Sequence, residues 1–142
     1  MVLVYFAAGL AIGTPETRGM IEVSDEHFHE LIDRAFDSLP VTHRDNVQNV
    51  AIVTADYPSP VQREELKLRC DQTLLGLYEG IPLPKRQGRE TLMPDVITLF
   101  KFPLLEQSTD EASLYENIRH TLWHEVAHYY GLDHAKIHEL EN

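Results

Sequence analysis

Apolar residues recur at helical spacing in two long stretches of the chain. The first stretch follows Ser24, which can cap a helix, and it stops before Pro40. Its apolar face comprises Phe28, Leu31, Ile32, Ala35 and Phe36. The second stretch follows Ser108–Glu111, which has the form of a capping box, and its apolar positions are Leu114, Ile118, Leu122, Val126 and Tyr129. Both stretches predict long helices with one face packed on a core.

Three shorter apolar segments between these helices have the composition of β-strands. Val47–Thr54 and Val96–Phe102 contain several β-branched residues, and Pro103 is expected to end the second of them. Leu75–Ile81 holds two glycines and precedes a proline, which favours a short strand followed by a turn. The charged segment Gln62–Asp71 is compatible with a short helix.

The order of these elements predicts an α+β fold, a compact domain with a small mixed sheet packed against two long helices. In such a domain an exposed edge strand can pair with an extended peptide. Val96–Phe102 and Leu75–Ile81 are both candidates for that edge strand. The polar and basic segment 84–93 predicts a surface loop.

The second helix carries the pattern H-E-x-x-H-x-x-G-x-x-H at residues 124–134. Residues four apart lie one above the other on a helix, so His124 and His128 can offer two imidazoles to one ion. Glu125 lies about 100° further round, where it can reach a water on that ion. Gly131 permits a left-handed turn that brings His134 back as a third ligand. Three protein ligands leave one position open for water, as in catalytic zinc sites.

The composition and net charge of the chain exclude several classes of partner and ligand. The 142 residues have room for one domain, with 43% hydrophobic and 25% charged residues as in ordinary globular proteins. A net charge of −11 argues against nucleic acid or anionic membranes as partners, because both require a basic surface. The sole cysteine, Cys70, can form no internal disulfide, so we expect a cytoplasmic protein whose zinc ligands are histidine or carboxylate.

The beginning of the chain differs from the rest. Val2–Ile12 is an apolar run too short to cross a bilayer, and no basic residue precedes it as in a signal peptide. Gly13–Glu16 then interrupts any regular structure. We therefore divide the chain into an N-terminal extension of uncertain status, residues 1–19, and a domain comprising residues 20–142.

Three segments together resemble a family of small bacterial zincin-like metallopeptidases that have a minimal matrix-metalloprotease-like fold. They are L-L-G-L-Y-E-G-I-P-L at 74–83, P-D-V-I-T-L-F at 94–100 and I-R-H-T-L-W-H-E-V-A-H-Y-Y-G-L-D-H at 118–134. The resemblance covers about residues 20–142. It implies a compact α+β zincin domain, Zn²⁺ as cofactor, a peptide or protein substrate, His124 and His128 as zinc ligands, and Glu125 as the catalytic carboxylate.

The chain departs from related patterns in two ways. Metzincins carry a methionine in a turn after the motif, and none follows His134 here. Members of the small family often have an acidic residue at that position, so Asp133 is the alternative third ligand, although His134 matches the longer motif.

Of the residues around the motif, Tyr129 and Tyr130 are expected in the core or at the helix end, and His120 at the surface.

The predicted function is zinc-dependent hydrolysis of peptide bonds. Zinc would lower the pKa of its bound water, and Glu125 would take the water's proton and pass it to the leaving amine. The main alternative is a non-enzymatic binding domain in which zinc fixes the C-terminal segment. Zinc-dependent endoribonucleases share the H-x-x-x-H-x-x-G-x-D-H spacing but lack the glutamate, and an acidic chain suits them poorly. The simplest reading without chemistry is a polar helix edge whose histidines face solvent.

Overall fold

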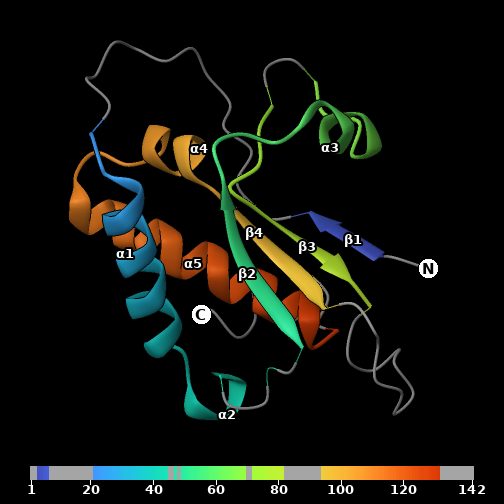
Figure 1. Cartoon of the computed structure of the whole chain (residues 1–142), viewed down its shortest axis with the longest axis horizontal. Helices are drawn as coiled ribbons and strands as arrows, with labels where there is room; N and C mark the ends of the chain where they lie inside the picture. Colours follow the sequence, from blue (N-terminus) through green and yellow to red (C-terminus); the bar gives the residue numbers. More distant parts are fainter. Residues whose placement is uncertain are drawn as a thin grey trace.

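The computed structural model describes residues 3–6, 21–44, 47, 49–69, 72–81 and 94–131. In chain order they form β1 (Leu3–Phe6), α1 (Asp25–Asp37), α2 (Val41–Arg44), β2 (Val50–Ala55), α3 (Pro60–Glu65), β3 (Gly76–Gly80), β4 (Asp95–Phe100), α4 (Lys101–Glu106) and α5 (Glu111–Tyr129). The two long helices, α1 and α5, pack against each other and against a small mixed sheet (Figure 1). The fold is therefore α+β, as the order of elements predicts.

The sheet has four strands in the order β1-β3-β4-β2. Strands β2 and β4 run parallel, with Val50 opposite Asp95 and Ala55 opposite Phe100. Strand β3 is antiparallel to β4 on one side and to β1 on the other. Because β4 has a partner on both sides, it is an interior strand and not the predicted edge strand. Strand β3 would be an edge only without β1.

Most of the core lies between the sheet and the two long helices. Its buried members include Phe28, Leu31, Ile32 and Ala35 from α1, Leu114, Ile118, Leu122, Val126 and Tyr129 from α5, and Tyr78, Ile97 and Leu99 from the sheet. A smaller cluster comprises Leu74, Leu77 and Phe100, with Leu66 and Leu68 packed against it. Every apolar position that helical spacing predicts on α5 is thus in the core, and this burial is the main stabilising term of the helix.

The expected end of the last strand is wrong. Strand β4 ends at Phe100, and both Lys101 and Phe102 belong to α4. Pro103 is the third residue of that helix, where its missing N–H costs nothing because the first turn has no intrahelical acceptor for it. A proline after an apolar run is therefore compatible with the start of a helix as well as with the end of a strand.

The start of α5 also differs from the prediction. Its N-cap is Asp110, whose carboxylate accepts the backbone N–H of Ser113 at 2.8 Å. The Ser113 hydroxyl accepts the Asp110 backbone N–H at 3.0 Å and completes the capping box. Ser108 instead donates its hydroxyl to the Leu104 carbonyl at 2.7 Å. The S-x-x-E pattern therefore marks the right region, but Ser108 does not cap α5: it bonds to the end of α4 and accepts the Asn117 side-chain amide from the second turn of α5 at 3.0 Å.

The remaining predictions about helices and strands are confirmed in part. Ser24 caps α1 as expected, accepting the His27 backbone N–H at 3.1 Å. Strand β2 begins at Val50, three residues after the predicted start. Helix α3 overlaps the region Gln62–Asp71, which was expected to hold a short helix, but it begins two residues earlier, at Pro60, and ends at Glu65. The segment 84–93 and Cys70 lie outside the described residues. In the ranges given above, no helix is both long and apolar enough to cross a membrane.

Part of the predicted N-terminal extension belongs to the sheet. Residues Leu3–Phe6 form β1 and pair with β3. The boundary at residue 20 between an extension and a domain remains a prediction, because backbone pairing does not show where an independent folding unit begins.

Candidate metal centre on helix α5

The apolar stripe of helix α5 is buried in the core. This packing sets the directions in which the other side chains of the helix point. Tyr130 is the C-cap, and the Gly131 backbone N–H donates to the His128 carbonyl at 2.9 Å. Gly131 has a φ of 79°, the left-handed conformation that glycine adopts without steric cost. The predicted left-handed turn at the end of the motif helix is therefore present, three residues after His128.

His124 and His128 lie next to each other, one turn apart on α5. Their ring centroids are 5.3 Å apart with an interplanar angle of 71°. Each residue is only 1% exposed, so the reading in which these histidines face solvent on a polar helix edge is wrong. Two buried imidazoles on one helix face are suited to share an ion that prefers nitrogen ligands, such as zinc.

Glu125 is fully buried on the neighbouring face of α5. Among the described residues neither carboxyl oxygen has a hydrogen bond of standard geometry. Burial raises the pKa of the Glu125 carboxyl well above its ordinary value, and the nearby backbone N–H of Tyr78 opposes that rise. Since Tyr78 is in β3, Glu125 lies between the motif helix and this strand. A buried carboxyl beside a pair of histidines is the arrangement expected of a proton acceptor at a metal-bound water.

Strand β3 can approach α5 closely because Gly76 lacks a side chain. A Cβ at Gly76 would lie 2.6 Å from the Thr121 Cγ2 atom, well inside van der Waals contact. Thr121 is itself buried and lies one turn before Glu125. In the sequence, the glycines of this segment indicate a turn and do not predict this contact, although a glycine inside a strand is also a sign of close backbone approach.

A buried hydrogen bond fixes β3 on its other side. The Tyr78 hydroxyl donates to the Asp95 carboxylate, which also accepts the Ile81 backbone N–H at 3.3 Å. The Tyr78 ring meets that of Tyr129 edge-on, with centroids 6.4 Å apart. The Tyr78 side chain thus contacts both β4 and α5, while the Tyr78 backbone lies near Glu125. No pattern in the sequence indicated this role.

The other residues around the motif have structural contacts. Tyr130 is half-buried and donates its hydroxyl to the His43 carbonyl. The His43 ring packs edge-on against Trp123, with centroids 4.9 Å apart, and connects α2 to α5. His120 is exposed, as expected, with its ring centroid 6.1 Å from that of His124. Tyr129 is buried in the core, also as expected.

The third predicted ligand, His134, and its alternative, Asp133, lie outside the described residues. Within the part of the chain that the structure does describe, no three His, Cys, Asp or Glu side chains are grouped closely enough to hold a metal ion. His124 and His128 supply two nitrogen donors, and the buried carboxyl of Glu125 would gain from a nearby cation, which offsets the cost of burying its negative charge. The residues present therefore fit zinc but require one more ligand.

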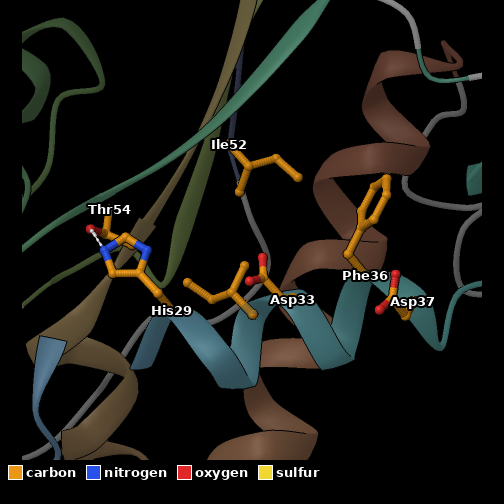
Figure 2. A pocket seen from close by; sticks show the side chains of 7 residues that line it. His29, Asp33, Phe36, Asp37, Ile52 and Thr54 are labelled. Atoms are coloured by element: carbon orange, nitrogen blue, oxygen red, sulfur yellow. Dashed lines mark hydrogen bonds between the residues drawn. The ribbon is translucent and has the colours of Figure 1, made fainter. Parts of the chain in front are cut away.

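A separate cavity of about 340 Å³ lies between α1 and β2 (Figure 2). Its lining comprises His29, Ile32, Asp33, Phe36, Asp37, Ile52 and Thr54. The His29 ring lies 3.4 Å from the Thr54 hydroxyl, and His29, Asp33 and Asp37 are exposed. None of the described motif residues, 124–131, lines this cavity, so it is separate from the candidate metal centre.

Comparison with known proteins agrees with this geometry. A family model described as zincin-like metallopeptidase matches residues 47–142, a range that includes β3, β4 and the whole of the motif. A search of curated proteins finds no match to the chain.

Proposed function

The chain belongs to the zincin-like metallopeptidases, and from that premise we propose that it hydrolyses peptide bonds in a zinc-dependent reaction. The observation that carries this proposal is the placement of three buried motif residues, His124, Glu125 and His128, on one rigid helix beside strand β3. His124 and His128 would be zinc ligands, and His134 the third, with Asp133 as the alternative.

Zinc bound at this site would lower the pKa of its water and polarise the carbonyl of the bond to be cleaved. Glu125 accepts the proton of the attacking water and delivers it to the leaving amine. Its complete burial next to His124 and His128 supports this role, because the carboxyl is held beside the proposed ligands and away from bulk water. The close packing of β3 on α5 excludes water from the side of Glu125 that faces Tyr78.

We place the substrate along β3, as an extended peptide that adds to this strand by backbone hydrogen bonds. Two features support the choice. Strand β4 lies between β3 and β2 in the interior of the sheet, whereas the outer neighbour of β3 is only the short strand β1, whose place a peptide could take. Strand β3 is the one whose backbone approaches Glu125, through Tyr78. Side chains of the peptide would then alternate toward and away from α5, so that specificity would depend on every second residue.

The decisive experiment is Glu125→Gln, which replaces the carboxylate by an amide of nearly the same shape. We expect turnover of a quenched fluorescent peptide library to fall roughly 10²–10⁴-fold, the usual contribution of a general base, while zinc content stays unchanged. The control is His120→Gln, an exposed substitution on the same helix that should keep full activity. Undiminished activity in Glu125→Gln would show that Glu125 is not the base.

The zinc ligands are tested separately by metal analysis. Protein purified without added metal should contain about one zinc ion per chain, and His134→Ala should lose most of it, because two imidazoles alone bind weakly. Asp133→Ala is the matched control and should retain zinc. If Asp133→Ala loses the metal and His134→Ala keeps it, the third ligand is the aspartate. Zinc bound tightly without any peptidase activity would favour the non-enzymatic binding domain.

A further inference from the structure

The chain's own N-terminal strand covers the edge of β3 beside Glu125. Strand β1 pairs antiparallel with β3, with Val4 opposite Glu79, Tyr5 opposite Tyr78 and Phe6 opposite Leu77, and the two strands run side by side in Figure 1. On its other side β3 pairs with β4. Strand β1 therefore occupies the side of β3 that β4 leaves open, where another strand could otherwise pair.

The stretch of β3 that β1 covers includes a residue in contact with the motif helix. Tyr78 lies in the middle of the pairing, and its ring meets that of Tyr129, the neighbour of His128 on α5, edge-on with centroids 6.4 Å apart. Gly76, at the start of the same strand, is where β3 contacts Thr121 of α5. A strand added along this side of β3 consequently lies next to the strand that packs on α5.

We propose that β1 is an intramolecular inhibitor, which occupies the position where an extended peptide would pair with β3. The inference rests on the proposed function, since it takes β3 as the strand that binds substrate. A peptide can make the backbone hydrogen bonds of strand addition only in molecules whose β1 has left. Its apparent affinity is therefore reduced by the fraction of molecules in which β3 is uncovered.

The sequence of β1 suits this role. Leu-Val-Tyr-Phe is apolar and rich in residues that favour strands. Its tether to the same chain gives it a high effective concentration at β3, so a substrate in free solution competes at a disadvantage. Activity then requires that β1 be displaced by a tightly binding peptide or removed by cleavage of the chain after it.

Two full-length variants test the pairing itself. Val4→Pro/Tyr5→Pro removes two consecutive backbone donors, and because alternate residues of a strand direct their N–H groups to the same neighbour, one of the two faces β3. The matched control, Val4→Thr/Tyr5→Thr, keeps both N–H groups and a high strand propensity. The probe is a fluorescein-labelled peptide with the sequence of residues 2–7 and a lysine at each end. Its binding is measured by anisotropy on metal-free protein, so that no cleavage occurs.

We expect the proline variant to bind this peptide at least about tenfold more tightly than the wild type, because its β3 is permanently uncovered. The threonine variant should bind like the wild type. Equal affinity for the wild type and the proline variant, or no binding to the proline variant, would overturn the proposal.

A reversible tether makes the test independent of how well the proline variant folds. Val4 and Glu79 are Cα partners in the sheet, so Val4→Cys/Glu79→Cys in a Cys70→Ser background can form a disulfide between β1 and β3. Oxidised and reduced forms of this one protein are then compared. Oxidation should reduce both peptide binding and peptide hydrolysis at least about tenfold, and identical values in the two forms would contradict the inference.

Failure of the proposed function would look different from failure of this inference. If the proline variant binds the peptide but hydrolyses no substrate with zinc present, β1 covers a binding strand and the peptidase assignment falls. If the wild type and the proline variant hydrolyse peptides equally fast, the peptidase assignment stands and β1 is not an inhibitor.

Discussion

Helices α1 and α5 pack side by side, yet they bury different kinds of residue. The buried residues of α1 are all apolar, and its charged side chains are exposed. Helix α5 buries an apolar stripe of the same kind, but it also buries Thr121, His124, Glu125 and His128. Apolar burial stabilises a fold, whereas burial of polar groups costs free energy unless they are bound or bonded. The comparison indicates that α1 serves stability, whereas stability alone does not account for the polar groups buried on α5, which are the candidates for the chemistry.

The largest effect should come from a cavity in α1. Leu31 is fully buried there, and Leu31→Ala should lower the free energy of unfolding by about 2–5 kcal/mol in urea titrations. If α1 serves stability alone, the zinc affinity of the protein that remains folded should stay within about tenfold of the wild-type value, as measured with a competing chelator. A much larger loss of affinity would show that α1 also positions the metal ligands.

A smaller effect should follow from separating α5 and β3. Gly76→Ala places a methyl group against the Thr121 Cγ2 atom, and such overpacking typically costs about 1–3 kcal/mol. Peptidase activity should fall as well, because β3 moves away from Glu125. Thr121→Ser removes the opposing methyl group, so the double variant should recover most of both losses. If the two substitutions are additive, the contact does not limit how closely β3 approaches.

The smallest effect concerns the contact between the two helices at their N-terminal ends. The His27 ring of α1 lies 2.6 Å from the Glu111 carboxylate of α5 and 3.2 Å from Glu30. Hydrogen bonds to Glu111 and then to Glu30 raise the pKa of His27 above its ordinary value of 6.5. A group whose pKa is raised by folding contributes stability fully below the unfolded pKa and loses it as the pH rises through the folded pKa.

His27→Gln should therefore lower the Tm more at about pH 5 than at about pH 9, by a small amount because the pair is exposed. Glu111→Gln should reproduce most of this pH dependence. A difference in Tm that does not change with pH would mean that the contact contributes packing and no charge interaction.

Spacing along a single helix was the most informative signal in the sequence. The apolar stripe of α5 and the adjacent positions of His124 and His128 both follow from the helical period, and the structure confirms this arrangement. The ends of elements were less predictable. Pro103 lies in a helix rather than after a strand, and Asp110 rather than Ser108 caps α5. Both errors arise because a short sequence pattern is compatible both with the end of one element and with the start of the next.

Contacts between distant segments could not be derived from local patterns. Nothing near Gly76 in the chain indicates that Thr121 will lie against it, and nothing near Tyr78 points to Glu125. Likewise the two predicted edge strands were equivalent in the sequence, and only the order β1-β3-β4-β2 excluded one of them. The roles of His124, Glu125, His128 and His134 remain predictions that metal analysis and substitution will decide.

The sequence by itself thus determined that this chain forms an α+β domain with a zincin motif on its last long helix, because both conclusions depend on periodicity and spacing within short segments. The tertiary structure alone decided that His124 and His128 are buried, that β3 is the strand beside Glu125, and that residues 3–6 cover it. Those facts depend on strand pairing and close packing between segments that are far apart in the chain. The free energy gained from such contacts belongs to the whole arrangement, so no single segment predicts it.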